Sequence, residues 1–249
     1  MIFKNDGKTL PYVEHFGPTI QGEGMVVGQK TYFVRFAGCD YSCSWCDSKF
    51  SWDGSVEPMR KTPHDLAEEI LTALRLTNGE LNCSHITLSG GNPALHGELM
   101  REFITELRQY GFTFSIETQG TAFQSWFELI DDFVLSPKPK SSGMKTNWEH
   151  LTRFVTQLSN LKVNYTFKLV VMDEHDLEFL TEVIDRFPSE KVIYASVGNP
   201  TPYSLEPVSP MLLQKLGWLW DEVVKNPKFN KVRPLPQTHV LVYENRRGV

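Results

Sequence analysis

Short runs of β-branched and aromatic residues alternate along the chain with longer segments in which apolar residues recur every three or four positions. This alternation is typical of repeated strand and helix units around a largely parallel sheet. We expect strands at residues 31–36, 85–89, 113–118, 132–137, 166–171, 191–196 and 238–243, and helices at 62–77, 97–110, 123–131, 147–160, 174–187 and 210–225. Several of these strands are apolar almost throughout, as strands covered on both faces are.

About six strand-helix units are fewer than the eight of a complete barrel. The sequence therefore predicts a single α/β domain spanning 1–249, built as an incomplete (β/α) barrel, with a doubly wound open sheet as the alternative. In both architectures the functional groups lie in loops at the carboxyl ends of the parallel strands. On the last helix the core-facing side is predicted to hold Leu212, Leu213, Leu216, Trp218 and Trp220.

Composition and charge exclude several classes of function. The 249 residues are 41% hydrophobic, enough for a sizeable core, and the net charge of -5 comes without a run of basic residues. A direct nucleic-acid partner is therefore disfavoured. The start "MIFKNDGKTL" has no apolar signal core, and no stretch approaches the roughly 20 apolar residues of a membrane span. We expect a cytoplasmic protein without a membrane partner, in a compartment that keeps thiols reduced.

Three of the four cysteines lie within the segment "FAGCDYSCSWCDS" at 36–48: Cys39, Cys43 and Cys46. A cubane iron-sulfur cluster is normally held by four thiolates, one on each iron. Three close thiolates would leave one iron open to bind a substrate or cofactor directly. The spacing therefore favours a reactive cluster over one that only transfers electrons.

A structural zinc site is the alternative for these cysteines, and it needs four Cys or His ligands. The fourth would have to be a distant histidine, such as His15, His64 or His239. In that case the protein would be a zinc-stabilised interaction module without catalytic activity. Cys83 precedes an apolar strand without a partner at motif spacing, so we expect it to be a small core residue.

The spacing C-x3-C-x2-C after a strand, with Trp45 before the last cysteine, is similar to the signature of the radical S-adenosylmethionine superfamily. The resemblance implies that the three cysteines hold a [4Fe-4S] cluster, whose open iron binds S-adenosylmethionine. An electron from an external donor of the flavodoxin type then yields a 5'-deoxyadenosyl radical, and no protein side chain is implied as a further catalytic group. The segment "SGGNP" at 89–93 resembles the Gly-Gly-Glu-Pro element of this superfamily, with Asn92 in place of Glu.

Further motifs indicate one family within this superfamily. The segments "FGPTIQGEG", "ETQGT", "LIDDF", "SPKP" and "VRPLPQTH" follow one another as in the 7-carboxy-7-deazaguanine synthase family. The resemblance implies conversion of 6-carboxy-5,6,7,8-tetrahydropterin to 7-carboxy-7-deazaguanine, a step toward queuosine-type deazapurines. In that reaction hydrogen is abstracted at C6, the ring contracts with Mg2+ and ammonia leaves. A homodimer is the family expectation. A glycyl-radical activase shares the cysteine spacing but acts on a polypeptide, whereas "TIQGEG" suits a small nitrogen-rich ring.

Matching positions carry the roles that the resemblance implies. Cofactor contacts are expected from Trp45, Cys46, Asp47, Gly91, Glu117, Ser136, Pro137 and Lys138. Substrate contacts are expected from Ile20, Gln21, Gly22, Glu23, Arg35, Ser89, His239 and Val249, with Gln237 as a further pocket residue. Ser48 stands where the family places a hydroxyl ligand for Mg2+.

Arg35 lies within an otherwise apolar strand and would be costly to bury without an anion. Its partner is either the carboxylate of the substrate, which the guanidinium fork matches, or a structural Asp or Glu. After the strand at 191–196, the segment "SVGNP" at 196–200 is expected to form a turn or to add a cofactor contact.

Overall fold

The computed structural model describes residues 6–188 and 191–249. In these residues the strands are β1 (Leu10–Ile20), β2 (Lys30–Phe36), β3 (Met59–Lys61), β4 (His85–Gly90), β5 (Thr113–Thr118), β6 (Asp132–Leu135), β7 (Asn164–Val171), β8 (Ile193–Val197) and β9 (Val232–Leu235). The α-helices are α1 (Pro63–Leu74), α2 (Leu99–Arg108), α3 (Trp148–Leu161), α4 (Glu174–Arg186), α5 (Ser209–Lys225) and α6 (Thr238–Tyr243).

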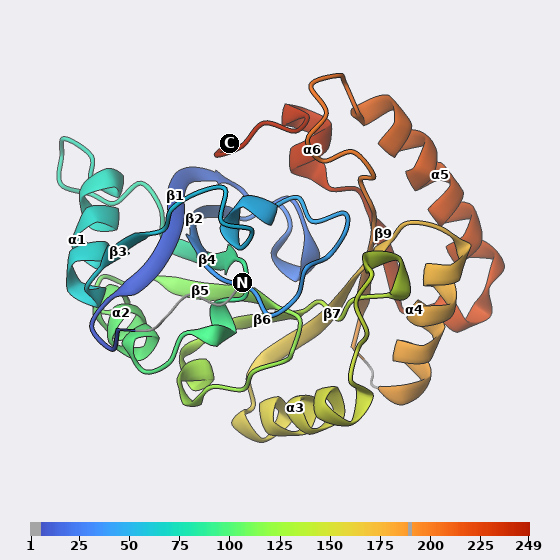
Figure 1. Cartoon of the computed structure of the whole chain (residues 1–249), viewed down its shortest axis with the longest axis horizontal. Helices are drawn as coiled ribbons and strands as arrows, with labels where there is room; N and C mark the ends of the chain where they lie inside the picture. Colours follow the sequence, from blue (N-terminus) through green and yellow to red (C-terminus); the bar gives the residue numbers. More distant parts are fainter. Residues whose placement is uncertain (1–5, 189–190) are drawn as a thin grey trace.

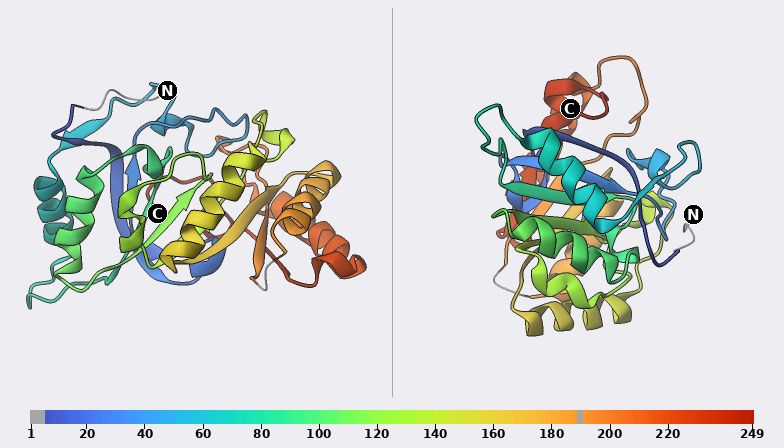
Figure 2. Two further views of the ribbon diagram at one scale, coloured as in Figure 1. Left: turned by 90° about the horizontal axis from the view of Figure 1, so that it is seen from below. Right: turned by 90° about the vertical axis from the view of Figure 1, so that its left-hand side faces the viewer.

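All of these strands join one curved sheet in the order β3-β1-β2-β4-β5-β6-β7-β8-β9. The pairs from β2 through β9 are parallel, while β1 is antiparallel to both β2 and β3. Helices α1 to α5 follow the outer side of the curve, and the C-terminal end returns toward β1 (Figure 1). Figure 2 gives two further views of this arrangement. The predicted incomplete barrel is confirmed, with β1 and β3 as additional antiparallel strands.

The core fills the space between the sheet and its helices. Thr62 caps α1 by accepting a hydrogen bond from the Asp65 amide, and the helix buries an apolar stripe that includes Leu66 and Ile70. Farther along, Phe127 packs edge-on against Phe133 with ring centroids 4.8 Å apart. Because the helices occupy the outer side, the carboxyl ends of the parallel strands remain free to build a site.

Residues 238–243 form helix α6, so the predicted strand there is wrong. β9 occupies the sheet edge instead, and the amides of Val240 and Leu241 donate to the carbonyl of Gln237, which closes a helical turn. The strands β1, β3 and β9 were not expected from the sequence pattern. The segment predicted as a helix at 123–131 is a short 3-10 helix, η4 (Ser125–Leu129).

The last long helix, α5, corrects a second prediction. Leu212 and Leu216 are buried as expected, and Trp218 is partly buried against the core. Leu213 and Trp220 are about half exposed, at 54% and 52%, because they lie two turns apart on the solvent side. No helix among the described residues combines the length and apolar character needed to cross a bilayer.

Candidate active site

A large cavity opens at the carboxyl ends of the parallel strands. It encloses about 1310 Å³ of space, including the part open to solvent. Its walls come from β2, β4, β5, β6 and β7 and the loops that follow them, from the end of β1 and from the C-terminal segment. Of the residues predicted for the site, the following line the cavity: Ile20, Gln21, Gly22, Glu23, Arg35, Cys39, Cys43, Trp45, Cys46, Asp47, Ser48, Ser89, Gly91, Glu117, Ser136, Lys138, Gln237, His239 and Val249. Pro137 is the exception, since it is buried behind the wall.

The three clustered cysteines lie in the loop after β2, and none of them forms a disulfide. Gln119 and the Tyr41 amide donate to Cys39 Sγ over 3.6 and 3.4 Å, and the Trp52 indole donates to Cys46 Sγ over 3.4 Å. Burial raises the pKa of all three thiols, that of Cys46 to about 12. Without a positive charge beside them these sulfurs would stay protonated, so the pocket suits thiolates bound to a metal.

The spacing of the three sulfurs distinguishes a cluster from a single ion. Four sulfurs around one zinc ion, each at 2.3 Å, would lie about 3.8 Å apart. Within the described residues, a group of at least three potential metal-binding side chains with all ligand atoms within 4.8 Å is found only at His64, Glu68 and Glu106. The cysteines do not meet this criterion, and a cubane that takes one thiolate on each of three irons needs no such closeness. The donor set therefore fits a [4Fe-4S] cluster.

The histidines proposed as distant zinc ligands lie elsewhere or face other partners. His15 contacts the Tyr32 hydroxyl at 2.7 Å, and His64 contacts Glu106 on the outer surface at 2.6 Å. His239 lines the cavity. Cys83 is 6% exposed in the core, as expected, and donates to the main-chain carbonyl of His85.

The Gly-Gly pair of "SGGNP" lets β4 end against the cysteine loop. The Gly91 amide donates to the Phe36 carbonyl, and a Cβ atom on Gly91 would lie 2.0 Å from the Gly38 carbonyl oxygen. Any side chain there would push the cysteine loop away. The requirement for glycine at this position is therefore steric.

Asn92, which replaces the usual Glu, is fully buried in a polar network under the same loop. Its amide group donates to Asp40 at 3.0 Å, and its carbonyl oxygen accepts from the Thr118 hydroxyl at 2.7 Å. Gln119 also donates to Asp40, at 2.6 Å. Asp40 lies directly after Cys39, so this network fixes the first part of the loop. Sequence reasoning did not identify Asp40 or Gln119.

A buried lysine joins two of the predicted acidic residues. Lys168 Nζ lies 2.6 Å from Glu117 Oε1 and 3.1 Å from Glu23 Oε2. Burial alone would lower the pKa of Lys168, but the charges of Glu117 and Glu23 outweigh it and raise the pKa. Burial would likewise raise the pKa of Glu117, which Lys168 and Lys138 instead hold below its ordinary value. Lys168 and Glu117 are therefore both charged near neutral pH. Lys168 was missed, although a lysine within an apolar strand is the same signal that identified Arg35.

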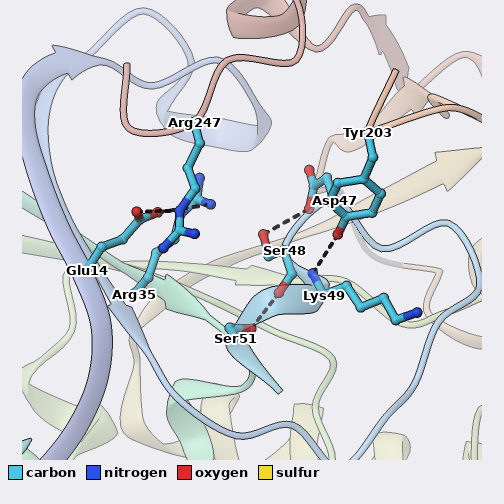
Figure 3. Close-up of polar contacts among 8 residues, drawn as sticks. All are labelled: Glu14, Arg35, Asp47, Ser48, Lys49, Ser51, Tyr203 and Arg247. Atoms are coloured by element: carbon cyan, nitrogen blue, oxygen red, sulfur yellow. Dashed lines mark hydrogen bonds and ion pairs between the residues drawn. The ribbon is translucent and has the colours of Figure 1, made fainter. Parts of the chain in front are cut away.

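Arg35 lines the cavity and also has a structural partner. Its guanidinium lies 3.4 Å from Glu14 Oε1, and Arg247 from the C-terminal segment lies 2.6 Å from Glu14 Oε2 (Figure 3). Arg247 also stacks over the Phe50 ring, 3.6 Å from its centroid. The two guanidinium groups share the Glu14 carboxylate, and Asp47 in the cavity wall is a further negative charge close enough to interact with Arg35.

Ser48 and its neighbours form the opposite wall. The Ser48 hydroxyl donates to Asp47 Oδ1 at 2.9 Å, and the Lys49 amide donates to the Tyr203 hydroxyl (Figure 3). The Tyr203 hydroxyl in turn donates to the Cys46 carbonyl. Burial would raise the pKa of Asp47, but Arg35 and His239 hold it below its ordinary value. The Asp47 carboxylate and the Ser48 hydroxyl therefore both lie in the cavity wall, with one negative charge between them. Tyr203 was not expected from the sequence.

The C-terminal segment closes the cavity as a helix instead of an edge strand. The Thr238 amide donates to the Gly22 carbonyl, and a Cβ atom on Gly22 would lie 2.4 Å from His239 Nδ1. The segment "TIQGEG" therefore meets α6 directly. Asn199 in the turn after β8 lines the cavity and donates to Asn245, which ties the turn to the segment after α6.

Comparisons with known proteins agree with this geometry. A family described as the Radical SAM superfamily matches residues 33–137. The 7-carboxy-7-deazaguanine synthase of Bacillus subtilis (strain 168) is 46% identical over 246 residues, covering 97% of this chain and 99% of that protein. The synthase of Bacillus cereus is 43% identical over 245 residues, covering 96% and 99%. Among solved structures, QueE from Escherichia coli covers 93% of this chain and 95% of its own, with a TM-score of 0.62 and 22% identity, a likeness that shows the fold alone. The chain therefore belongs to the 7-carboxy-7-deazaguanine synthase family of radical S-adenosylmethionine enzymes, as its motifs predicted.

Proposed function

We propose that this enzyme forms 7-carboxy-7-deazaguanine from 6-carboxy-5,6,7,8-tetrahydropterin within a single radical S-adenosylmethionine domain spanning 1–249. One observation carries the proposal. Three cysteines suited to a cluster and the cationic Arg35 lie in the same cavity, with Glu23 also in its wall. A carboxylated, nitrogen-rich heterocycle is complementary to the last two groups.

In this proposal Cys39, Cys43 and Cys46 hold a [4Fe-4S] cluster, and S-adenosylmethionine binds beside it. When bound, the cluster and the cofactor supply a 5'-deoxyadenosyl radical as the hydrogen-abstracting species. Residues expected to border the cofactor are Trp45, Cys46, Asp47, Gly91, Glu117, Ser136, Pro137 and Lys138. Trp45 is oriented by the Ser141 hydroxyl, and Lys138 donates to Ser136 at 2.7 Å, so both side chains are already held in place.

The pterin would bind between "TIQGEG" and Arg35. Glu23 accepts from the N–H groups of the pyrimidinone edge. Gln21 lies beside it, and the Gln21 side-chain oxygen Oε1 accepts from the main-chain amide of Glu23 at 3.2 Å. Phe16 and Phe33, stacked with ring centroids 5.1 Å apart, contribute an apolar wall. Arg35 binds the carboxylate of the substrate.

The remaining substrate contacts are expected from Ile20, Gly22, Ser89, His239 and Val249. The segment after β9 packs against Gly22 at the wall of the cavity. We assign to this segment the function of limiting the access of water, because solvent would react with a radical.

For Mg2+ we propose Ser48 as the protein ligand. A single neutral hydroxyl binds a hard divalent cation weakly, so oxygens of the substrate and of water must complete the shell. The neighbouring Asp47 carboxylate accepts from the Ser48 hydroxyl and thereby orients its lone pairs. We expect Mg2+ to bind weakly until the substrate is present.

We further propose that the enzyme works in the cytoplasm as a homodimer, with an external donor of the flavodoxin type. The spacing of Cys39, Cys43 and Cys46 without a disulfide partner at motif spacing agrees with a reducing compartment, and the dimer rests on the family expectation. The zinc module has no support among the described residues, because the three cysteine sulfurs do not all lie within 4.8 Å of one another. The activase would have to act on a polypeptide, whereas Glu23 and Arg35 in the cavity wall suit a small polar ring.

Metal analysis after anaerobic purification tests the first part of the proposal. About four iron and four sulfide per chain are expected, whereas one zinc without iron would contradict it. Incubation with S-adenosylmethionine, reductant, Mg2+ and 6-carboxy-5,6,7,8-tetrahydropterin then tests the reaction by product mass.

A further inference from the structure

Lys168 occupies an unusual place for a lysine. Its side chain is 4% exposed within β7, whose neighbouring positions are apolar and buried. An ammonium group is expensive to remove from water unless it is paired. Its two partners, Glu117 from β5 and Glu23 from the end of "TIQGEG", both line the cavity, and so does Lys168 itself. The ion pairs therefore form part of the cavity wall.

Glu23 has one satisfied and one free oxygen. Oε2 accepts from Lys168, whereas Oε1 is buried and has no hydrogen-bond partner among the described residues. A buried carboxylate oxygen without a donor is unfavourable, because it has lost its hydrogen bonds to water without replacement. A ligand that brings an N–H group to Oε1 recovers this cost, so the arrangement is prepared for a donor that only a ligand supplies.

We propose that Lys168 is a positioning residue for pterin recognition: it holds Glu23 through Oε2, so that Oε1 accepts from the N–H edge of the pyrimidinone ring. The inference rests on the proposed function and deepens it. Lys168 does not touch the substrate in this account. It fixes the orientation of the group that does, and it connects that group to Glu117, which is expected to border the cofactor.

The competing explanation is that Lys168 only neutralises two buried carboxylates. Lys168→Met would then destabilise the fold by leaving Glu23 and Glu117 unpaired. A second substitution separates the explanations, because Glu117→Gln removes one of the two charges and relieves the repulsion. The double variant Lys168→Met/Glu117→Gln should regain thermal stability, and its pterin affinity should be compared with that of Glu117→Gln alone.

Two probes read the binding of the ring edge and of the carboxylate separately. Both 6-carboxypterin and unsubstituted pterin carry the pyrimidinone edge, and only the first carries the carboxylate. Their intrinsic fluorescence reports binding to the cluster-containing protein with S-adenosylmethionine and without reductant, so no turnover occurs. We expect the double variant to bind both probes about 10-fold or more weakly than Glu117→Gln, the loss of about one charge-assisted hydrogen bond.

Two controls define the result. Arg35→Ala should lose the preference for 6-carboxypterin while keeping its affinity for pterin. This differs from the double variant, which should bind both probes more weakly. Lys215→Met removes a different lysine, which is half-buried and lies outside the cavity wall. Lys215 donates to the Met172 carbonyl. It should leave both affinities unchanged.

The role of Lys168 is contradicted if the double variant binds pterin within about twofold of Glu117→Gln, since a purely neutralising lysine predicts that result. Product formation by the unsubstituted enzyme separates this failure from that of the proposed function. If the unsubstituted enzyme makes 7-carboxy-7-deazaguanine while the double variant keeps its affinity, only the role of Lys168 fails. If the unsubstituted enzyme makes no product, the proposed function fails and the inference fails with it.

Discussion

The four cysteines differ in what their sulfur atoms contact. Cys39 and Cys46 accept N–H groups from Gln119 and Trp52, as a thiolate or a cluster ligand does. Cys83 instead donates to the carbonyls of Lys30 and His85. The sulfur environments therefore distinguish the proposed cluster ligands from a core residue.

Replacing Cys39, Cys43 or Cys46 by Ala should abolish cofactor cleavage and sharply lower the iron content, because a cubane with two protein ligands is poorly held. Cys83→Ala is the matched control and should keep both, at a cost of about 1 kcal/mol for the small cavity. Iron analysis and the yield of 5'-deoxyadenosine measure the difference. A Cys43→Ala variant that still forms 5'-deoxyadenosine would contradict the assignment.

Arg35 faces both Glu14 and the cavity, and Arg247 shares the same carboxylate without lining the cavity. Arg35→Ala should weaken binding of 6-carboxypterin by about 10- to 100-fold, as expected for losing a bidentate charged contact. Arg247→Ala should change it by less than about threefold. Fluorescence titration of both variants decides the matter, and equal, small effects would make Arg35 a structural residue.

The structure gives a reason for Asn92 at the position where the Gly-Gly-Glu-Pro element has Glu, because the Asn92 side-chain amide donates to Asp40. A glutamate at this buried position would set a second carboxylate against Asp40. Asn92→Glu should therefore reduce the free energy of unfolding by about 1 to 3 kcal/mol and lower iron retention. Adding Asp40→Asn should restore much of both. Thermal melts and iron analysis test this, and an Asn92→Glu variant as stable as the unsubstituted enzyme would refute it.

At the scale of elements, the C-terminal segment depends on contacts with the loop between β8 and α5. Asn245 donates to the carbonyls of Thr201 and Ser204 and accepts from Asn199, and Glu244 accepts from the first amides at the start of α5. These bonds hold α6 over the cavity. The helix therefore owes its position to the residues that follow it.

Asn245→Ala should loosen this segment and weaken pterin binding several-fold, while the iron content stays unchanged because the cysteine loop is not involved. Asn226→Ala is the control, since Asn226 caps the short helix at the other end of α5. It should lower stability by about 1 kcal/mol without changing affinity. Equal affinities for the two variants would show that the tail does not help to form the pterin site.

The parallel strands were predictable from the sequence because their buried, apolar runs carry the fold. Residues 113–118 are an example, since the strand spans these positions as predicted. The strand β1 was not predictable in the same way, because Pro11, Gly17 and Pro18 interrupt its pattern and its pairing with β2 and β3 stabilises it. Residues 238–243 are rich in β-branched and apolar residues like a strand, yet β9 already occupies the sheet edge. Tertiary context thus overrides local pattern where the chain leaves the barrel.

The same limit applies to the site. Motifs identified Glu23 and Glu117, but only the structure brings them together on Lys168, since a loop and two strands that are far apart in the sequence must meet. Lys168 and Arg35 carry the same signal in the sequence, a cation within an apolar strand.

For the whole molecule, pH should act through two buried histidines. Burial lowers the pKa of His85 and His96 to about 4, against 6.5 for an exposed histidine. The unfolded chain therefore binds more protons between these values, and stability falls as the pH falls. Between pH 7.5 and 5.5 the loss is about 1 kcal/mol for each histidine.

Urea unfolding at both pH values measures this loss, with cluster absorbance followed to show that iron stays bound. The double variant His85→Gln/His96→Gln should flatten the dependence. His64→Gln should leave the acid loss in place, because Glu106 raises the pKa of the exposed His64. A dependence that persists fully in the double variant would assign it to other groups.

The central claim is that one cavity joins a radical-generating cluster to a site for a carboxylated pterin. Anaerobic incubation of the reconstituted enzyme with S-adenosylmethionine, reductant, Mg2+ and 6-carboxy-5,6,7,8-tetrahydropterin, followed by mass analysis of the product, tests it most directly. We predict 7-carboxy-7-deazaguanine and released ammonia. Formation of 5'-deoxyadenosine with the pterin left unchanged would contradict the claim.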